Sequence, residues 1–289
     1  MLADRFTTAF LKSNLLPAND WHPWPTAGER RSWNSVRPPV RQMLIQRAQA
    51  LLKESFPPLP ATLYLEFART GDRDKFQSPY FKRHLRLSTL ALAECLENRG
   101  RFLDPLLDIL WAIFEESSWS LPAHIYVQRA GCGLPDTTEP IVDLYAAETG
   151  MDLAWIWYLL GPQLDTLTPL IGQRLLREVT SRILDPCLQR DYNWMGLQTG
   201  RVNNWNPWVC SHWLTALLIL ESDPHRRIES VAKILRCLDV FIRQYPADGG
   251  CDEGPGYWTR AGASLFDCLE ILHSATRGRI DLYRESLIR

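Results

Sequence analysis

Carboxylic acids, a phenol and an indole lie together in the segment "DGGCDEGPGYW", at residues 248–258, between two stretches of helical periodicity. The segment holds Asp252, Glu253, Tyr257 and Trp258 among glycines and a proline, which break helices and therefore predict a loop. Carboxyl groups and phenols can transfer protons to or from a substrate. We therefore consider this loop a candidate for catalysis.

Tyr257 stands where the helix after this loop is expected to begin. A phenol is a weak base near neutral pH unless positive charge or hydrogen bonds stabilise its phenolate. Arg201 and Arg260 could supply that charge. Three roles remain open for Asp252 and Glu253: general acid, partner of a helix N-terminus, or anchor of the loop.

A second group of polar residues occurs in "RVNNWNPWVCSHW", at residues 201–213. Asn206 followed by Pro207 predicts a helix start, with Asn206 as the N-cap and the proline as the first helical residue. The amides of Asn203 and Asn204 can hydrogen-bond a carboxylate or a sugar hydroxyl, and the positive helix N-terminus favours an anion nearby. Alternatively, these two residues hold left-handed turn positions.

Tryptophan is abundant, with 12 in 289 residues, and several indoles fall in or beside expected loops. Indole faces in loops are typical of sugar-binding clefts, whereas the alternative is packing of loops onto helix ends. Trp208 and His212 are four residues apart and so share a helix face, although a lone helical histidine is more often packed than catalytic. The loop indoles are Trp119, Trp194, Trp205 and Trp208.

The segment "EESSWSLPAHIY", at residues 115–126, opens a further long loop. Its polar and aromatic side chains are candidates for the same cleft. They are Glu116, Trp119, His124 and Tyr126.

Helical periodicity recurs along the chain and strand alternation is almost absent. Short turns and long loops alternate, which is typical of an array of helical hairpins. Because each short turn reverses the chain at one end, the long loops at 119–140, 186–206 and 245–257 are expected on one face, where function tends to lie. The predicted helices span 39–55, 80–98, 102–118, 141–160, 167–185, 207–221, 225–244 and 258–275, with another that starts near 280.

Composition and motifs exclude several classes of function. A formal net charge of -1 gives no field that attracts nucleic acid, and no apolar run approaches a membrane span of about 20 residues. Without a recognisable signal peptide, the chain is expected to be cytoplasmic. The seven cysteines form no C-x-x-C pair, so neither a zinc site nor a disulfide framework is expected. Nucleotide, zinc-protease and serine-hydrolase motifs are absent, and we expect no cofactor and no metal.

"VNNWNPW", followed some 45 residues later by "DGGCDEGPGYWTRAGASLFD", resembles the heparinase II/III-like proteins, a polysaccharide lyase family. "EESSWSLPAH" and "DLYAAETGMDLAW" fit the same family, so the resemblance begins near residue 75. It implies an all-α fold, an incomplete (α/α) toroid of helical hairpins, here a single domain over 1–289. Residues 1–75 would be a helical extension and 76–289 the hairpins.

In that family the toroid is usually followed by a C-terminal β-sandwich, and many members are periplasmic or secreted. Because the sequence "DLYRESLIR" ends in or just after an expected helix, we expect the chain to be part of a longer protein, with a missing β-sandwich that packs on the toroid.

The resemblance also implies a reaction, β-elimination on an acidic, uronic-acid-containing polysaccharide such as heparan, alginate or a related glycan. In the family an asparagine neutralises the substrate carboxylate and a tyrosine acts as acid and often as base. The matching residues are Asn203 or Asn204, and Tyr257. The family commonly has histidine directly after the asparagine, where this chain has Trp205. Substrate-binding roles are expected for Trp205, Trp208, Glu253, Arg201, His124, Trp119, His212 and Trp258.

Two other functions remain open. Six-hairpin glycoside hydrolases share the helical-hairpin architecture and use two carboxylates, which here would be Glu253 or Asp252 with Glu116. The third possibility is an inactive carbohydrate-binding toroid. A lyase releases an unsaturated, ultraviolet-absorbing product, a hydrolase releases only reducing ends, and a binding module releases neither.

Overall fold

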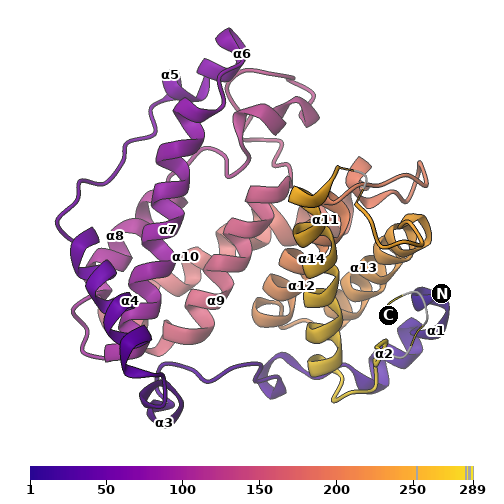
Figure 1. The fold of residues 1–289 in the computed structure, drawn as a ribbon, viewed down its shortest axis with the longest axis horizontal. Helices are drawn as coiled ribbons and strands as arrows, with labels where there is room; N and C mark the ends of the chain where they lie inside the picture. The colour runs from indigo at the N-terminus through magenta and orange to yellow at the C-terminus, as the bar shows by residue number, and fades with distance from the viewer. Residues whose placement is uncertain (252, 284, 286–287, 289) are drawn as a thin grey trace. The chain divides into compact units, whose positions relative to one another are not determined.

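The computed structural model describes residues 1–251, 253–283, 285 and 288. Every regular element in these residues is helical, which confirms the all-α class (Figure 1). The toroidal arrangement and the single-domain organisation stay predictions. The chain divides into two compact units: a first unit of Met1–Pro23, Val142–Met151 and Ser181–Arg289, and a second unit of Trp24–Ile141 and Asp152–Thr180.

The first unit is built around α12 (Trp205–Leu220), which is buried over most of its length. A helix that is apolar on all sides is stable only when neighbours surround it. Here α13 (Pro224–Gln244) and α14 (Pro255–Ala275) pack beside it (Figure 1). The other elements of this unit are α1 (Leu2–Arg5), α2 (Thr8–Asn14), η1 (Ala18–Asp20), α11 (Asp185–Gln189) and η4 (Asn193–Met195).

The start of α12 differs from the prediction. The helix begins at Trp205 with Asn204 at the N-cap position, and Oδ1 of the preceding residue, Asn203, accepts from the Trp205 main-chain N at 3.1 Å. Asn206 is therefore not the N-cap; it is fully buried inside the helix. Its Nδ2 donates to three main-chain carbonyls, those of Trp194 at 3.1 Å, Met195 at 3.3 Å and Cys237 at 3.1 Å.

The two long loops of the first unit, 186–206 and 245–257, meet at the same end of the helices. Asn203 Nδ2 donates to Glu253 Oε1 at 3.2 Å, and the main-chain N of Val202 donates to Gln244 Oε1 at 3.3 Å. The prediction that these two loops share a face is thus confirmed. The third long loop, 119–140, belongs to the second unit.

In the second unit, α7 (Asp74–Glu97) packs against α4 (Pro38–Leu51) and α8 (Leu103–Phe114). The remaining elements here are α3 (Arg30–Asn34), α5 (Ala61–Tyr64), α6 (Glu66–Thr70), η2 (Pro122–Val127) and α10 (Leu170–Val179). Two elements belong to both units: α9 (Leu144–Leu167) and η3 (Thr180–Leu184).

Some predicted elements are wrong. The break predicted between the helices at 141–160 and 167–185 is helical as far as Leu167, because α9 continues through Pro162 and buries Leu164 completely. Burial of an apolar face here outweighs the main-chain hydrogen bond that proline removes. The helix expected to start near 280 is not formed by the described residues 280–283, 285 and 288.

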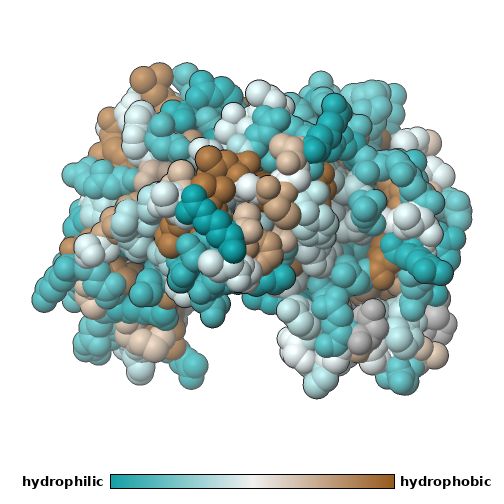
Figure 2. Space-filling model, turned by 90° about the horizontal axis from the view of Figure 1, so that it is seen from above, coloured by the Kyte–Doolittle hydropathy of each residue, from teal (hydrophilic) through white to brown (hydrophobic). Residues whose placement is uncertain are grey.

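Figure 2 shows hydrophobic patches separated by hydrophilic side chains. Exposed aromatic residues include Tyr257, Trp258 and Phe266, all on α14. Within the described ranges, none of the helices combines the length and the apolar character that crossing a membrane would require.

Candidate functional site

The loop before α14 bends as its glycines predict. Gly249 and Gly254 have φ of 74° and 86°, a region that glycine enters without steric cost. Pro255 is the first residue of α14, and Trp258 Nε1 donates to the Gly249 carbonyl at 2.8 Å, which ties the loop to the first helical turn. This arrangement places Tyr257 in that first turn, 46% exposed.

The two adjacent asparagines have different environments. Asn203 makes two side-chain hydrogen bonds: its Oδ1 accepts from the first main-chain N–H of α12, that of Trp205, and its Nδ2 donates to Glu253. Asn204 is only 2% exposed, and neither its Nδ2 nor its Oδ1 has a hydrogen-bond partner among the described residues. A buried polar group left unpaired costs about 1–3 kcal/mol, so it needs an explanation. Asn204 therefore has an amide whose hydrogen-bonding groups are unused among the described residues, whereas Asn203 links the two loops.

Asn204 begins a row of such groups along α12. Trp208 and His212 follow at four-residue intervals, which places the three side chains on one helix face. Trp208 Nε1 and His212 Nδ1 are also buried and without a hydrogen-bond partner in the described part of the chain. We call Asn204, Trp208 and His212 the α12 polar row.

Arg260, one turn after Tyr257 on α14, lies over Trp208 of this row. Its guanidinium is 4.4 Å from the centre of the Trp208 ring, and no carboxylate among the described residues pairs with it. Tyr145, in the first turn of α9, approaches the same indole edge-on, with ring centres 6.2 Å apart. An unpaired cation above a buried row of polar groups is suited to binding an anion.

Electrostatic coupling brings Tyr257 into this group. Burial raises the pKa of Tyr145, and the negative charge of Glu148 raises it further. The positive charge of Arg260 acts in the opposite direction. Tyr257 lies close enough to Tyr145 to raise this pKa as well. Tyr145 is therefore a neutral hydrogen-bond donor at physiological pH. The site thus combines residues from the starts of α9, α12 and α14, all within the first unit.

His212 is held neutral. Burial lowers its pKa to about 3, and the positive charge of Arg260 acts in the same direction. Its Nδ1 is buried and has no hydrogen-bond partner among the described residues. A group with such a low pKa cannot serve as an efficient general base near neutral pH.

We expect His212 to make the protein less stable in mild acid. Its folded-state pKa of about 3 lies below the ordinary 6.5, so the unfolded chain takes up the proton first and stability falls as pH drops below 6.5. Between pH 6.5 and 5 the loss is about 2 kcal/mol of unfolding free energy. Chemical denaturation at pH 7 and 5 measures it. His212→Gln should remove this part of the decline, whereas replacing the exposed His225 should retain it; equal declines in both variants would contradict the prediction.

Several predicted binding residues lie elsewhere. Trp119 is 2% exposed in the second unit and its Nε1 donates to the Ile113 carbonyl at 3.0 Å, so the prediction of a cleft indole is wrong because packing makes it core. His124 is buried in η2 of the same unit. Glu116 forms a buried ion pair with Arg83 at 2.8 Å.

Among the remaining predicted residues, Trp205 is half-buried, while Arg201, Glu253 and Trp258 are exposed. Trp194 is buried in the first unit and its Nε1 donates to the Val142 carbonyl at 3.0 Å. Tyr126 is exposed in the second unit, and Asp252 lies outside the described residues.

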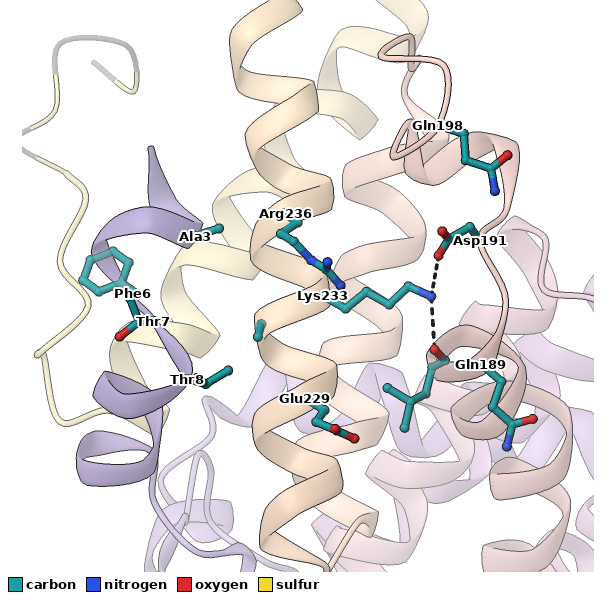
Figure 3. Close-up of a pocket in the computed structure, with 12 residues that line it drawn as sticks. Ala3, Phe6, Thr7, Thr8, Gln189, Asp191, Gln198, Glu229, Lys233 and Arg236 are labelled. Atoms are coloured by element: carbon teal, nitrogen blue, oxygen red, sulfur yellow. Dashed lines mark hydrogen bonds and ion pairs between the residues drawn. The ribbon is translucent and has the colours of Figure 1, made fainter.

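The first unit also contains a cavity of about 890 Å³ (Figure 3). Its buried cation, Lys233, points toward the loop after α11 and bonds to Asp191 at 2.8 Å and to the carbonyls of Leu188 and Arg190 at 3.1 and 2.6 Å. These contacts use all three donors of an ammonium group. The lysine therefore stabilises the loop and has no donor left for a ligand, in contrast to Arg260.

Cysteines and metal-binding groups add no chemistry to the site. Burial raises the pKa of the thiols of Cys187, Cys210 and Cys268, so these side chains behave as apolar core. Among the described residues, no group of three or more histidine, cysteine or acidic side chains is arranged to hold a metal ion.

Sequence reasoning did not select Tyr145 and Glu148. Both lie in "DLYAAETG", one helical turn apart, and Asp143 Oδ1 accepts from the main-chain N of Ala146 at 2.8 Å at the start of that helix. The sequence pattern that could have indicated these two residues is an acid and a phenol on one face of the first turns of a helix. Comparison of the chain with protein-family models and with curated proteins finds no match, so the family resemblance depends on the sequence motifs alone.

Proposed function

We propose that this protein is a polysaccharide lyase, similar to the heparinase II/III-like family, that cleaves a uronic-acid-containing polysaccharide by β-elimination. The observation that supports the proposal is the grouping of three features in the first unit. These are the buried, unpartnered amide of Asn204, the unpaired guanidinium of Arg260, and the exposed phenol of Tyr257 one turn away.

The proposed reaction begins at the uronate carboxylate. Asn204 and Arg260 bind it and reduce its negative charge, so the neighbouring C5 proton becomes acidic enough to remove. Tyr257 acts as the base that takes this proton. The C5–H electrons form the C4–C5 double bond, and the C4–O4 bond breaks with its electron pair on oxygen. Tyr257 then protonates that oxygen, so no water is consumed.

The indoles have separate roles in this proposal. The Trp208 ring is 4% exposed, with Arg260 over its face, so its Nε1 rather than its face is available for interaction. Trp258 is 53% exposed beside Tyr257 and offers a face on which a sugar ring can stack. The substrate is an acidic polysaccharide, and packing of a β-sandwich domain on the helices is part of the proposal.

The carboxylates named for a hydrolase have other partners. Glu253 accepts a hydrogen bond from Asn203, and Glu116 forms its buried ion pair within the second unit. Hydrolysis needs one carboxyl group to protonate the leaving oxygen and a second to activate water or attack carbon. No observation on the described residues favours that arrangement over the lyase site.

An assay on a panel of uronate polysaccharides tests the function. Purified protein is incubated with heparosan, hyaluronan, alginate and a uronate-free glucan, and ultraviolet absorbance and new reducing ends are measured together. We expect equal molar amounts of unsaturated uronate and reducing ends from at least one uronate polymer and neither from the glucan. Reducing ends without absorbance would show a hydrolase, and binding without either product would show a carbohydrate-binding module.

A further inference from the structure

The segment from Arg30 to Lys53, which forms α3 and α4 in the second unit, carries positive charge only. It contains six basic residues and neither aspartate nor glutamate, in a chain whose formal net charge is -1. The rest of the chain is therefore acidic overall, and positive charge is concentrated on these two helices. Such a separation creates a local field that the net charge of the whole protein conceals.

Two of the six cations stabilise the fold. The Arg30 guanidinium donates to the carbonyls of Cys95 at 2.6 Å and Leu96 at 2.8 Å, and the Arg41 guanidinium donates to the Leu96 carbonyl at 2.6 Å. These carbonyls belong to the last turn of α7, where the helix dipole favours positive charge. Arg30 and Arg41 therefore hold α3 and α4 against α7 (Figure 1).

The other four cations are exposed and have no partner among the described residues. None of them forms an ion pair or a side-chain hydrogen bond there. Because no acidic residue occurs between Glu29 and Glu54, their charge is not balanced by neighbours along the chain. These four cations are Arg31, Arg37, Arg47 and Lys53.

The outer side of α4 is polar over its whole length. Leu44, Ile45 and Ala48 are half-buried or buried, and the helix packs on α7. Gln42 and Gln46 are exposed on the opposite side of the helix. With 14 residues, α4 is about 21 Å long, so its outer side is suited to contact an extended polymer.

The side chains on this surface match a polymer that carries both anionic groups and hydroxyls. Guanidinium groups bind carboxylates through paired N–H donors, and the amides of exposed glutamines hydrogen-bond to hydroxyls. An acidic polysaccharide carries both kinds of group along its length. This surface is therefore complementary to it in charge and in hydrogen bonding.

Two other anionic partners match this surface less well. A helix that binds lipid inserts its apolar side into the membrane, whereas the apolar side of α4 is covered where the helix packs on α7. A single-stranded nucleic acid stacks its bases on exposed aromatic rings. Trp33, the one aromatic residue of the segment, is half-buried, and its Nε1 donates to the Thr26 carbonyl at 2.9 Å.

We propose that the exposed cations of α3 and α4 form a second binding site for the acidic polysaccharide, in the second unit, whereas the residues proposed to cleave it belong to the first unit. The choice of polysaccharide rests on the proposed function; the unbalanced positive charge does not. A polymer bound to the second unit stays near the first, because one chain forms both, so the effective concentration of its other sugar residues at Asn204 and Tyr257 rises. The second site thus assists long polymers and leaves short oligosaccharides unaffected.

A four-fold variant, Arg31→Gln, Arg37→Gln, Arg47→Gln and Lys53→Gln, tests this proposal. Glutamine removes each charge and keeps a polar side chain with good helix propensity. The matched control replaces four exposed cations outside this segment, which also lack ion pairs among the described residues, so that both variants have the same net charge. These are Lys12, Arg69, Arg236 and Arg279.

Calorimetry at low salt measures binding of the three proteins to heparosan, hyaluronan, alginate and neutral dextran. We expect the four-fold variant to bind at least one acidic polymer about 10-fold more weakly than the unaltered protein, the control to bind as the unaltered protein does, and dextran to bind to none. For the polymer that is cleaved, KM should rise by a similar factor in the four-fold variant, while the kinetics on a tetrasaccharide stay the same. Thermal denaturation verifies that both variants fold.

Equal affinity of the three proteins for every acidic polymer would overturn the proposal, and so would an equal loss in the four-fold variant and the control, which would show an effect of net charge alone. Vesicles containing phosphatidylserine and duplex DNA are compared in the same assay. If either binds more tightly than every polysaccharide and is lost in the four-fold variant, the surface serves a membrane or a nucleic acid and the proposal is wrong.

The two proposals fail in different ways. Elimination with an unchanged KM for the long polymer in the four-fold variant would refute the second site and leave the proposed function in place. Absence of unsaturated product from every polymer would refute the proposed function, and the binding comparison would still decide whether α3 and α4 bind an acidic polysaccharide.

Discussion

Replacing Tyr257 by phenylalanine lowers the rate of elimination by about 100-fold or more, which is the usual contribution of a positioned proton donor. The change removes only a hydroxyl from a side chain that is 46% exposed, so the free energy of unfolding should change by less than about 0.5 kcal/mol. Steady-state rates of ultraviolet-absorbing product on the polymer selected by the panel assay measure the first effect. Thermal denaturation measures the second.

Tyr126→Phe is the control for this experiment. Tyr126 is 60% exposed in the second unit, and its substitution also removes one exposed phenol hydroxyl. We expect the control to keep the full rate. A Tyr257→Phe protein that eliminates at the parental rate would end the assignment of Tyr257 as the acid and, with it, the proposed mechanism.

Asn204→Ala is expected to lose activity without losing stability. Without its amide the carboxylate is no longer neutralised in the transition state, at a cost of about 3–4 kcal/mol, or roughly 100- to 1,000-fold in turnover. The unfolding free energy should stay the same or rise by about 1 kcal/mol, because two buried atoms that lack partners are removed. Such a trade-off is typical of a residue kept for function.

Asn206→Ala, two residues away, is expected to lower stability, in contrast to Asn204→Ala. Its side chain is equally buried, but its Nδ2 makes three hydrogen bonds to main-chain carbonyls. Losing these three buried hydrogen bonds should lower the unfolding free energy by about 2–4 kcal/mol. If Asn204→Ala destabilised the protein as strongly as Asn206→Ala and kept its activity, Asn204 would be a structural residue and the site would lose its anion-binding amide.

The all-helical fold and most helix positions could be predicted because their causes are local. The pattern over 225–244 matches α13 (Pro224–Gln244), whose start is capped by Asp223 directly before Pro224. Gly254 and Pro255 likewise mark the start of α14. Periodicity, caps and breakers all act over a few residues, so the sequence carries them directly. The failure at Pro162 shows the limit, since the burial of Leu164 outweighs a strong local breaker.

The sequence could predict which segments form the candidate site, but not which residues in those segments have unused hydrogen-bonding groups. Both loops and Tyr257 were identified from their residue types, because acids, amides, glycines and aromatics in a loop are visible in any sequence. Which asparagine is free depends on Glu253, 50 positions away from Asn203, whose carboxylate occupies one amide and leaves the next one unpaired. The indoles differ in the same way, since packing buries Trp119 and leaves Trp258 exposed.

The amino-acid sequence by itself determined the class of fold, the two loops that meet at one end of the first unit, and the residue types able to bind and protonate a sugar acid. Only the tertiary structure decided the state of each group. His212 stays neutral because burial lowers its pKa to about 3, and helix packing places Arg260 over the Trp208 ring, where no carboxylate of the described residues pairs with it. Hydrogen bonding, burial and charge pairing are properties of neighbours in space, and here those neighbours come from distant parts of the chain.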